Sequence, residues 1–213
     1  MLNKFFQEIE KDECDKNCPF KQKKDRPIII IPPPKKPSIM IISRDPTMSF
    51  LPLYNYSKNN YKDDEIQRLM LFSGAIPQRL LMKINQFLTR TNNKKPIKDF
   101  YKLFDIAYWT HLHKCPTDDK STFEKYCADK WLIKEITEAI DSGIKVIITL
   151  GKDVRNWIDQ RREFLENNNI KIINLYHPSG IVAKWYDVSS YNEIDKALSE
   201  LLKLINSITK ESL

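Results

Sequence analysis

The chain has 213 residues, which is long enough for one domain with a sizeable hydrophobic core and short for two. Hydrophobic residues make up 41% and charged residues 30%, a composition that excludes a disordered chain. The net charge of +7 favours an anionic partner such as nucleic acid or a membrane surface, although a lysine-rich solvated surface would give the same charge. No apolar run of about 18 residues is present, so we expect no membrane span. From the length of the chain we expect one domain over residues 1–213, and we expect the protein to be a monomer.

The N-terminal stretch "MLNKFFQEIEKDEC" is charged too early for a secretory signal peptide, so we expect an intracellular, cytoplasmic protein. Thiols stay reduced there, and the four cysteines therefore indicate a metal site more than disulfides. Residues 1–13 are expected to form a short amphipathic helix with Phe5, Phe6 and Ile9 on one face. A cysteine-bearing loop follows, so that residues 1–37 precede an α/β core over residues 38–213.

The apolar run from Ser38 to Ser43 predicts a buried strand, and the tyrosine-rich, polar stretch 49–64 a surface loop. Helical spacing recurs over 66–71 and 77–88, and "FDIAYWTHLHKC" predicts a second strand. A helix is expected over 121–142, where Ser121 and Glu124 form a capping box and Gly143 ends it.

A third strand is predicted over 145–151, a helix over 153–167, a fourth strand over 170–180 and a final helix over 191–208. Strands that alternate with helices indicate a three-layer α/β sandwich, in which helices flank a central four-stranded parallel sheet.

The four predicted strands end in "SRDPT", "THLHKC", "TLGK" and "YHPSG". Sites of open α/β sheets collect at the carboxyl ends of the strands, so Asp45, His111, His113 and His177 are expected at one edge. Asp45 could act as a general base or orient a water molecule, and a neutral His177 could donate a hydrogen bond to a developing oxyanion. Taken singly, both residues are equally typical of turns.

The cysteines fall into one close pair, Cys14 and Cys18, and one wide pair, Cys115 and Cys127. A structural zinc site usually has two close pairs, whereas a [4Fe–4S] cluster tolerates irregular spacing. Four unconnected, reduced cysteines remain a third interpretation.

Five stretches follow one another in the chain: the early cysteines with "IMIISRDPT", then "LFSGAIPQRLL", "YWTHLHKC", "CADKWLIKEI…KVIITLGK" and "YHPSG". In this order they resemble motifs of the uracil-DNA glycosylase superfamily, and most closely of its iron–sulfur branch (families 4 and 5). "YWTHLHKC" resembles a strand that ends in T-N-x-x-K-C, and "YHPSG" matches an H-P-S motif. The resemblance extends from about Cys14 to Gly180 and implies a four-stranded parallel sheet between helices.

The resemblance also implies roles for individual residues. Cys14, Cys18, Cys115 and Cys127 would ligate a [4Fe–4S] cluster with a structural role. Phe72 would stack on a flipped-out uracil, and His177 would face uracil O2 and stabilise the departing uracilate.

Two positions differ from the iron–sulfur branch. Its G-E-x-P-G loop is replaced by Ser43–Thr47, which is more similar to the G-Q-D-P-Y loop of the classical branch. In that branch the aspartate of the loop orients the attacking water, so the resemblance implies this role for Asp45. Ser43, Arg44 and Thr47 would then contact the base, with Thr47 in place of a tyrosine that excludes the thymine methyl group. His111 stands where an asparagine reads the uracil edge, so another deaminated base is also conceivable, and His111 or His113 could trap the sugar covalently.

The resemblance thus implies a base-excision-repair enzyme that hydrolyses the N-glycosidic bond of uracil or a related base in DNA. Five residues are expected at the DNA: Lys152, Ser179, Gly180, Ile181 and Lys184. Ile181, Val182 or Trp185 could form an apolar wedge in the duplex. The alternatives are a catalytically inactive iron–sulfur DNA-binding protein on the same fold and, more remotely, a zinc-binding nucleic-acid module.

Overall fold

The structure is a computed structural model that describes residues 9, 28–46, 51–92, 102–116, 127–179, 185 and 188–211. Its centre is a sheet of four parallel strands in the order β2-β1-β3-β4, which confirms the predicted fold class. The strands are β1 (Ile39–Ser43), β2 (Ala107–His111), β3 (Val146–Leu150) and β4 (Lys171–Leu175). The first three are buried along their whole length, as expected for parallel strands that helices cover on both faces.

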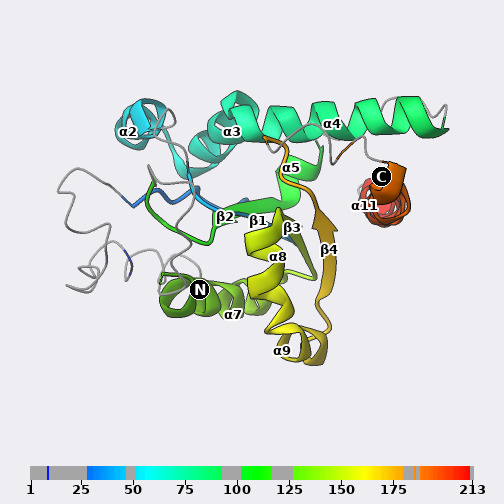
Figure 1. Cartoon of the computed structure of the whole chain (residues 1–213). Helices are drawn as coiled ribbons and strands as arrows, with labels where there is room; N and C mark the ends of the chain where they lie inside the picture. The colour runs from blue at the N-terminus through cyan, green and yellow to red at the C-terminus, as the bar shows by residue number, and fades with distance from the viewer. Residues whose placement is uncertain are drawn as a thin grey trace.

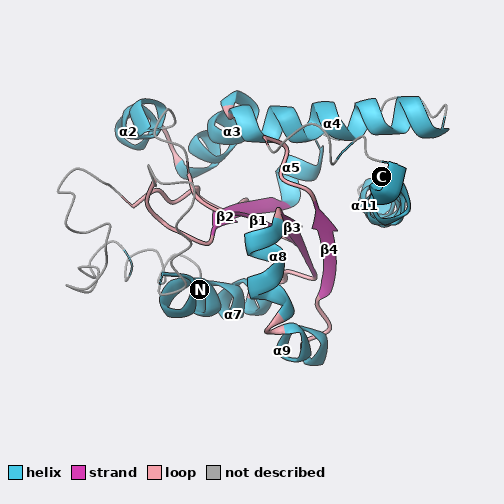
Figure 2. Cartoon of the chain, viewed as in Figure 1, coloured by secondary structure: helices cyan, strands magenta, loops and turns pink. Residues whose placement is uncertain are grey.

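Helices cover both faces of the sheet (Figures 1 and 2). On one face lie α2 (Leu51–Asn60), α3 (Asp63–Ser73), α4 (Ala75–Asn92), α5 (Lys102–Ile106) and α11 (Tyr191–Glu211). On the other lie the π-helix η2 (Ala128–Leu132), α7 (Ile133–Asp141), α8 (Lys152–Asp159) and α9 (Arg162–Asn167). A single 3-10 turn, η3 (Val188–Ser190), precedes α11.

Alternation along the strands builds two separate cores. Ile39 and Ile41 of β1 face the helices of the α2–α5 and α11 layer, whereas Met40 and Ile42 face the α7–α9 layer. Because successive side chains of a strand point to opposite faces, the continuous apolar run in β1 supplies both cores.

Two sequence predictions about secondary structure are wrong. Residues 49–64 were expected to form a surface loop, but 51–60 form α2 and α3 begins at Asp63. Only Tyr54 and Ser57 of α2 are buried, so its helical periodicity is too weak to recognise, and packing against α3 holds it. Phe104 was expected in a strand but lies in α5, where it is buried beneath α3.

The remaining boundaries follow the expectations within a few residues, except that β4 ends at Leu175 although this strand was predicted to reach residue 180, and that one helix is interrupted. Gly143 adopts φ +107° and ends the helix at α7, as predicted, because this backbone conformation is unfavourable for residues with a Cβ. The helix expected over 153–167 is divided into α8 and α9, with no glycine or proline at the break. The capping box of Ser121 and Glu124, and Phe5 and Phe6, lie outside the described residues. None of the helices in the described ranges is long and apolar enough to cross a membrane.

Candidate active site at the carboxyl edge of the sheet

The carboxyl ends of β1 and β2 are held together beyond the strands themselves. Ser43 is in register with His111, and the N–H groups of Leu112 and His113 donate to the carbonyls of Ser43 and Arg44, each at 2.9 Å. These hydrogen bonds place the loop that carries Asp45 beside His111 and His113. The convergence that parallel strands predicted is thereby established for this half of the edge.

The other half is formed by the ends of β3 and β4, where Gly151 permits a close approach. Gly151 adopts φ +95°, and its N–H donates to the carbonyl of Leu175 at 2.9 Å. A Cβ at this position would lie 3.1 Å from the Cβ of His177, which is tighter than nine in ten real Cβ contacts. Gly151 therefore allows the backbone that carries His177 to pack directly against the end of β3.

A cavity of about 280 Å³ opens at this edge. Three residues predicted for the site contribute to its wall: Ser43, Asp45 and His111. The other lining residues are Ile31, Pro46, Leu53, Ser73, Ala75, Ile76, Pro77, Arg79 and Trp109. Trp109 is fixed there because its Nε1 donates to the Ser43 hydroxyl at 3.1 Å. An apolar pocket with a few convergent polar groups is typical of a small-ligand site.

His177 has a defined tautomer. Its Nδ1 lies 3.3 Å from the backbone nitrogen of Ser179 and 2.6 Å from the Ser179 hydroxyl. A backbone N–H can only donate, so Nδ1 is the acceptor and the proton of the neutral ring lies on Nε2. Burial lowers the pKa of His177, the charges of Arg44 and Arg79 lower it further, and Asp45 offsets part of the change. At neutral pH, His177 is therefore an uncharged Nε2–H donor.

His111 is buried beside the same cavity. Its burial, together with the charges of Lys114, His177 and His113, lowers the pKa of His111 to about 3. The ring is therefore neutral at physiological pH and offers one donor and one acceptor to a ligand.

Asp45 is held by its neighbour in the sequence. The Arg44 Nε donates to Asp45 Oδ1 at 2.5 Å, and Arg44 Nη1 lies 3.8 Å from Asp153 Oδ2 on α8. Arg44 thus connects the β1 loop to the helix that follows β3. It also fixes the orientation of the Asp45 carboxylate. The Asp45 side chain is 13% exposed.

Behind β2 lies a buried ionic network that sequence analysis missed. The Lys114 ammonium donates to Thr110 Oγ1 at 2.7 Å, to the carbonyl of His111 at 2.8 Å and to Glu135 Oε2. Glu135 Oε1 accepts from Thr110 Oγ1 at 2.9 Å and from the Tyr108 hydroxyl. Burial and the negative charge of Glu135 raise the pKa of Tyr108 well above its ordinary value. The network fixes the peptide of His111 from behind.

Other predicted site residues lie farther from the 280 Å³ cavity. Phe72, at the end of α3, is 40% exposed, packs edge-on against Phe104 at 5.5 Å between ring centroids, and does not line the cavity. Lys152 and Ser179 are exposed at the carboxyl edge. The predicted residues Thr47, Gly180, Ile181 and Lys184 lie outside the described part of the chain, as does Val182.

The wedge assignment of Trp185 is wrong. Its side chain is 1% exposed and belongs to the larger core, so it cannot insert into a duplex from this position. It instead lines a second cavity, as do Lys152 and His177.

The cysteine prediction can be followed only in part. Cys14 and Cys18 lie outside the described residues, and Cys115 and Cys127 are half-buried. Within the described ranges, no group of three or more potential ligands comes together. Cys127, however, packs in a small cluster with Ile9, Trp131, Ile28 and Ile30, and the Ile29 N–H donates to the carbonyl of Lys114 at 2.8 Å. The described residues Ile9 and Ile28–Ile30 thus lie next to Cys127 and next to the residue before Cys115.

Three contributors to the site were not anticipated: Arg79, Trp109 and the Lys114–Glu135 pair. In the sequence, Arg79 is one residue of a predicted helix and Trp109 one residue of a predicted strand, and neither residue by itself indicates a site. A lysine and a glutamate 21 positions apart carry no local signal of pairing. The only available signal was the place of Trp109 and Lys114 within "YWTHLHKC", the strand end singled out for His111.

The comparisons with known proteins agree with this geometry. The model of the Uracil DNA glycosylase superfamily matches residues 32–202, which include all four strands and every residue that lines the two cavities except Ile31. No curated protein matches the chain. Because the family match covers most of the sequence and contains Asp45, His111 and His177, the chain belongs to the uracil DNA glycosylase superfamily.

Proposed function

We propose that this protein is a DNA glycosylase that removes uracil or a related deaminated base from DNA. The observation that carries the proposal is the neutral His177, which has its proton on Nε2 and lies at the same sheet edge as the Asp45 carboxylate. Membership of the superfamily supports a glycosylase-like enzyme and a DNA partner in general terms.

In the proposed mechanism, the protein extrudes the damaged nucleotide from the base stack and holds the base in the 280 Å³ cavity. As the N-glycosidic bond breaks, the bonding electrons move to the base, and the Nε2–H of His177 donates to the oxygen that gains negative charge. Asp45, oriented by Arg44, positions the water that attacks the anomeric carbon. The products are the free base and an abasic site.

We further propose that His111 and Arg79 select the base. Both line the cavity, and His111 presents a neutral imidazole in place of the amide that the resemblance led us to expect. The two nitrogens of an imidazole can each form one hydrogen bond, but they point in different directions. The oxygen and the NH2 group of an amide can form hydrogen bonds with two adjacent atoms of a base edge at the same time. We therefore expect His111→Asn to shift the preference towards uracil.

Cys115 and Cys127 could ligate an iron–sulfur cluster, because both thiols are half-buried and Cys127 packs beside Ile9, Ile28 and Ile30. We propose that they hold a [4Fe–4S] cluster together with Cys14 and Cys18. When bound, the cluster would supply a covalent tie between the N-terminal segment and the end of β2. The catalytic steps above do not involve it.

The decisive experiment is single-turnover release of the base from oligonucleotides that contain uracil, hypoxanthine, xanthine or a thymine mismatch, followed by cleavage at the abasic site. We expect Asp45→Asn to slow release about 10²–10⁴-fold, and His177→Ala about 10²–10³-fold. Asp153→Asn is the matched control, because it removes the same charge 3.8 Å from Arg44 and is 43% exposed.

Asp153→Asn should leave the rate nearly unchanged. If the wild-type protein binds these oligonucleotides and releases none of the four bases, the protein is instead an inactive DNA-binding member of the superfamily. If Asp45→Asn is fully active while His111→Ala is inactive, water activation by Asp45 is wrong and a mechanism centred on His111 replaces it.

A further inference from the structure

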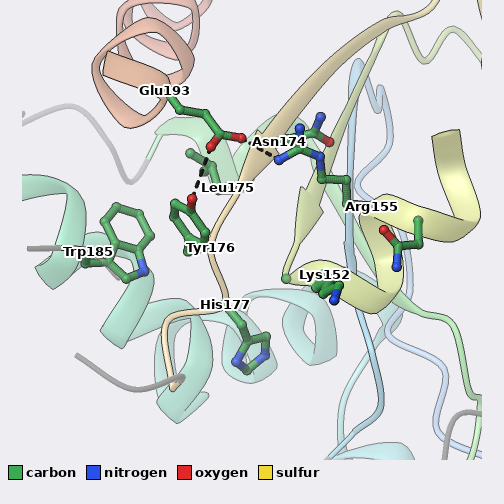
Figure 3. A pocket seen from close by; sticks show the side chains of 10 residues that line it. Lys152, Arg155, Asn174, Leu175, Tyr176, His177, Trp185 and Glu193 are labelled. Atoms are coloured by element: carbon green, nitrogen blue, oxygen red, sulfur yellow. Dashed lines mark hydrogen bonds and ion pairs between the residues drawn. The ribbon is translucent and has the colours of Figure 1, made fainter. Parts of the chain in front are cut away.

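A second and larger cavity, of about 630 Å³, lies at the same edge of the sheet, between the start of α8, the end of β4 and the start of α11 (Figure 3). Its lining combines cations, amides and aromatic rings: Gly151, Lys152, Arg155, Asn156, Asn174, Leu175, Tyr176, His177, Trp185 and Glu193. The volume is within the range of small-molecule sites, about 300–1,000 Å³. The proposed catalytic mechanism uses only His177 of this set.

We propose that this cavity holds the nucleotide that adjoins the excised one in the DNA strand, with its base stacked on Tyr176 and its phosphate at Lys152. The inference rests on the proposed glycosylase function, since it places a second nucleotide of the same substrate. It assigns a ligand to a cavity that the catalytic mechanism leaves without a role.

The Tyr176 ring is half-buried and held in place through its hydroxyl. Its hydroxyl donates to Glu193 Oε2 at 3.1 Å and lies 3.3 Å from the Ser190 hydroxyl, while Glu193 Oε1 pairs with Arg155. Figure 3 shows the Tyr176 ring between Glu193 above and His177 below. A ring fixed at its hydroxyl loses little entropy when a base stacks on it, and every base has a face that can stack.

The cavity also presents polar groups whose capacity is unused. Within the described part of the chain, neither the Lys152 ammonium nor the Asn156 amide makes a hydrogen bond or an ion pair. Both side chains are exposed, and Lys152 follows Gly151 at the start of α8, where backbone N–H groups favour an anion. A phosphate would satisfy the lysine, and a base edge would satisfy the amide.

Trp185 supplies an independent observation. Its indole is 1% exposed, and among the described residues its Nε1 has no acceptor. In Figure 3 the nitrogen edge of the indole faces Tyr176 and His177. A buried donor without a partner is destabilising, so its presence in a cavity wall favours a ligand that carries an acceptor.

His177 connects the two cavities. It lines the larger one, and its pKa responds to Asp45 and Arg79, which line the smaller one. In the proposed mechanism His177 donates to the base held in the smaller cavity, so the sugar and phosphate of that nucleotide would lie near His177. The next nucleotide of the strand is then the ligand within reach of Tyr176.

The test uses oligonucleotides that contain one tetrahydrofuran abasic analogue, which binds without being cleaved, and measures affinity by fluorescence anisotropy. A second tetrahydrofuran then replaces the adjoining nucleotide on the 3′ side or on the 5′ side. We expect removal of the adjoining base on one side to weaken binding about tenfold, as for the loss of one stacked base.

Tyr176→Ala should reduce this ratio to near one, and Tyr176→Phe, which keeps the ring, should restore it. Lys152→Ala should weaken both oligonucleotides by a similar factor and leave the ratio intact, because it removes a phosphate contact. Phe164→Ala, an exposed aromatic of α9 that does not line the cavity, is the matched control and should change neither value.

Equal affinity with and without the adjoining base on both sides would overturn the inference, as would a ratio that is unchanged in Tyr176→Ala. Uracil release, measured on the same preparation, separates this result from the proposed activity. Base release without dependence on the adjoining base refutes only the second site, whereas such dependence without release refutes only the glycosylase assignment.

Discussion

Replacing Lys114 by methionine tests the buried ionic network behind β2. The Lys114 and Glu135 side chains are 3% and 2% exposed, and the ammonium donates its three hydrogens to Glu135, Thr110 and the carbonyl of His111. Lys114→Met keeps most of the length of the side chain, lacks the ammonium and leaves the Glu135 carboxylate buried without its cation. Breaking a buried ion pair from one side costs about 3–5 kcal/mol.

In a chain of 213 residues, each kcal/mol lowers Tm by about 2–4 °C, so we expect a decrease of roughly 6–20 °C. Thermal and urea unfolding followed by circular dichroism measure the change. The matched control is Lys171→Met, whose ammonium lies 3.5 Å from Glu200 in an exposed pair. Its loss should cost no more than about 1 kcal/mol.

Removing both charges, in Lys114→Met with Glu135→Leu, should recover part of the loss because no charge is then left buried. Recovery is expected to be incomplete, since the buried Tyr108 hydroxyl loses its acceptor. The reasoning is refuted if Lys114→Met is no more destabilising than Lys171→Met, or if the double variant is less stable than Lys114→Met alone.

Four further predictions concern pH, iron, salt and the β3 end. The folded-state pKa of about 3 for His111 lies below its ordinary 6.5, so the unfolded chain binds the proton first. The free energy of unfolding should therefore decrease as the pH falls from 6.5 towards 3. Urea titrations should show a weaker pH dependence for His111→Phe. Anaerobically purified protein should contain about four iron atoms, which Cys115→Ala should abolish; stoichiometric zinc would contradict this. DNA affinity should fall steeply with salt, and a flat response would contradict phosphate binding. Gly151→Ala should slow base release by displacing His177, whereas an unchanged rate would show that the contact can relax.

The sequence by itself determined the layers of this protein and the edge at which its chemistry lies. Four apolar runs separated by helical patterns indicate a parallel sheet, and the carboxyl ends of parallel strands lie at one edge of the sheet. Asp45, His111 and His177 could therefore be assigned to the same edge although they are far apart along the chain. Gly143 could be recognised as a helix end because its requirement for a positive φ is local.

Only the tertiary structure decided features that depend on what packs against a segment. Residues 51–60 form a helix because Ser57 packs against Met70 of α3 and the Tyr54 hydroxyl accepts from the Ile30 N–H, contacts that the polar local sequence does not reveal. The position of Trp185 in the sequence suggested an exposed wedge, but its ring is buried in the larger core. Lys114 pairs with Glu135, and Gly151 lies against His177, only because strands and helices distant in sequence become neighbours. Local propensity fixes neither burial nor partners, because both are set by surfaces that exist only after the layers have assembled.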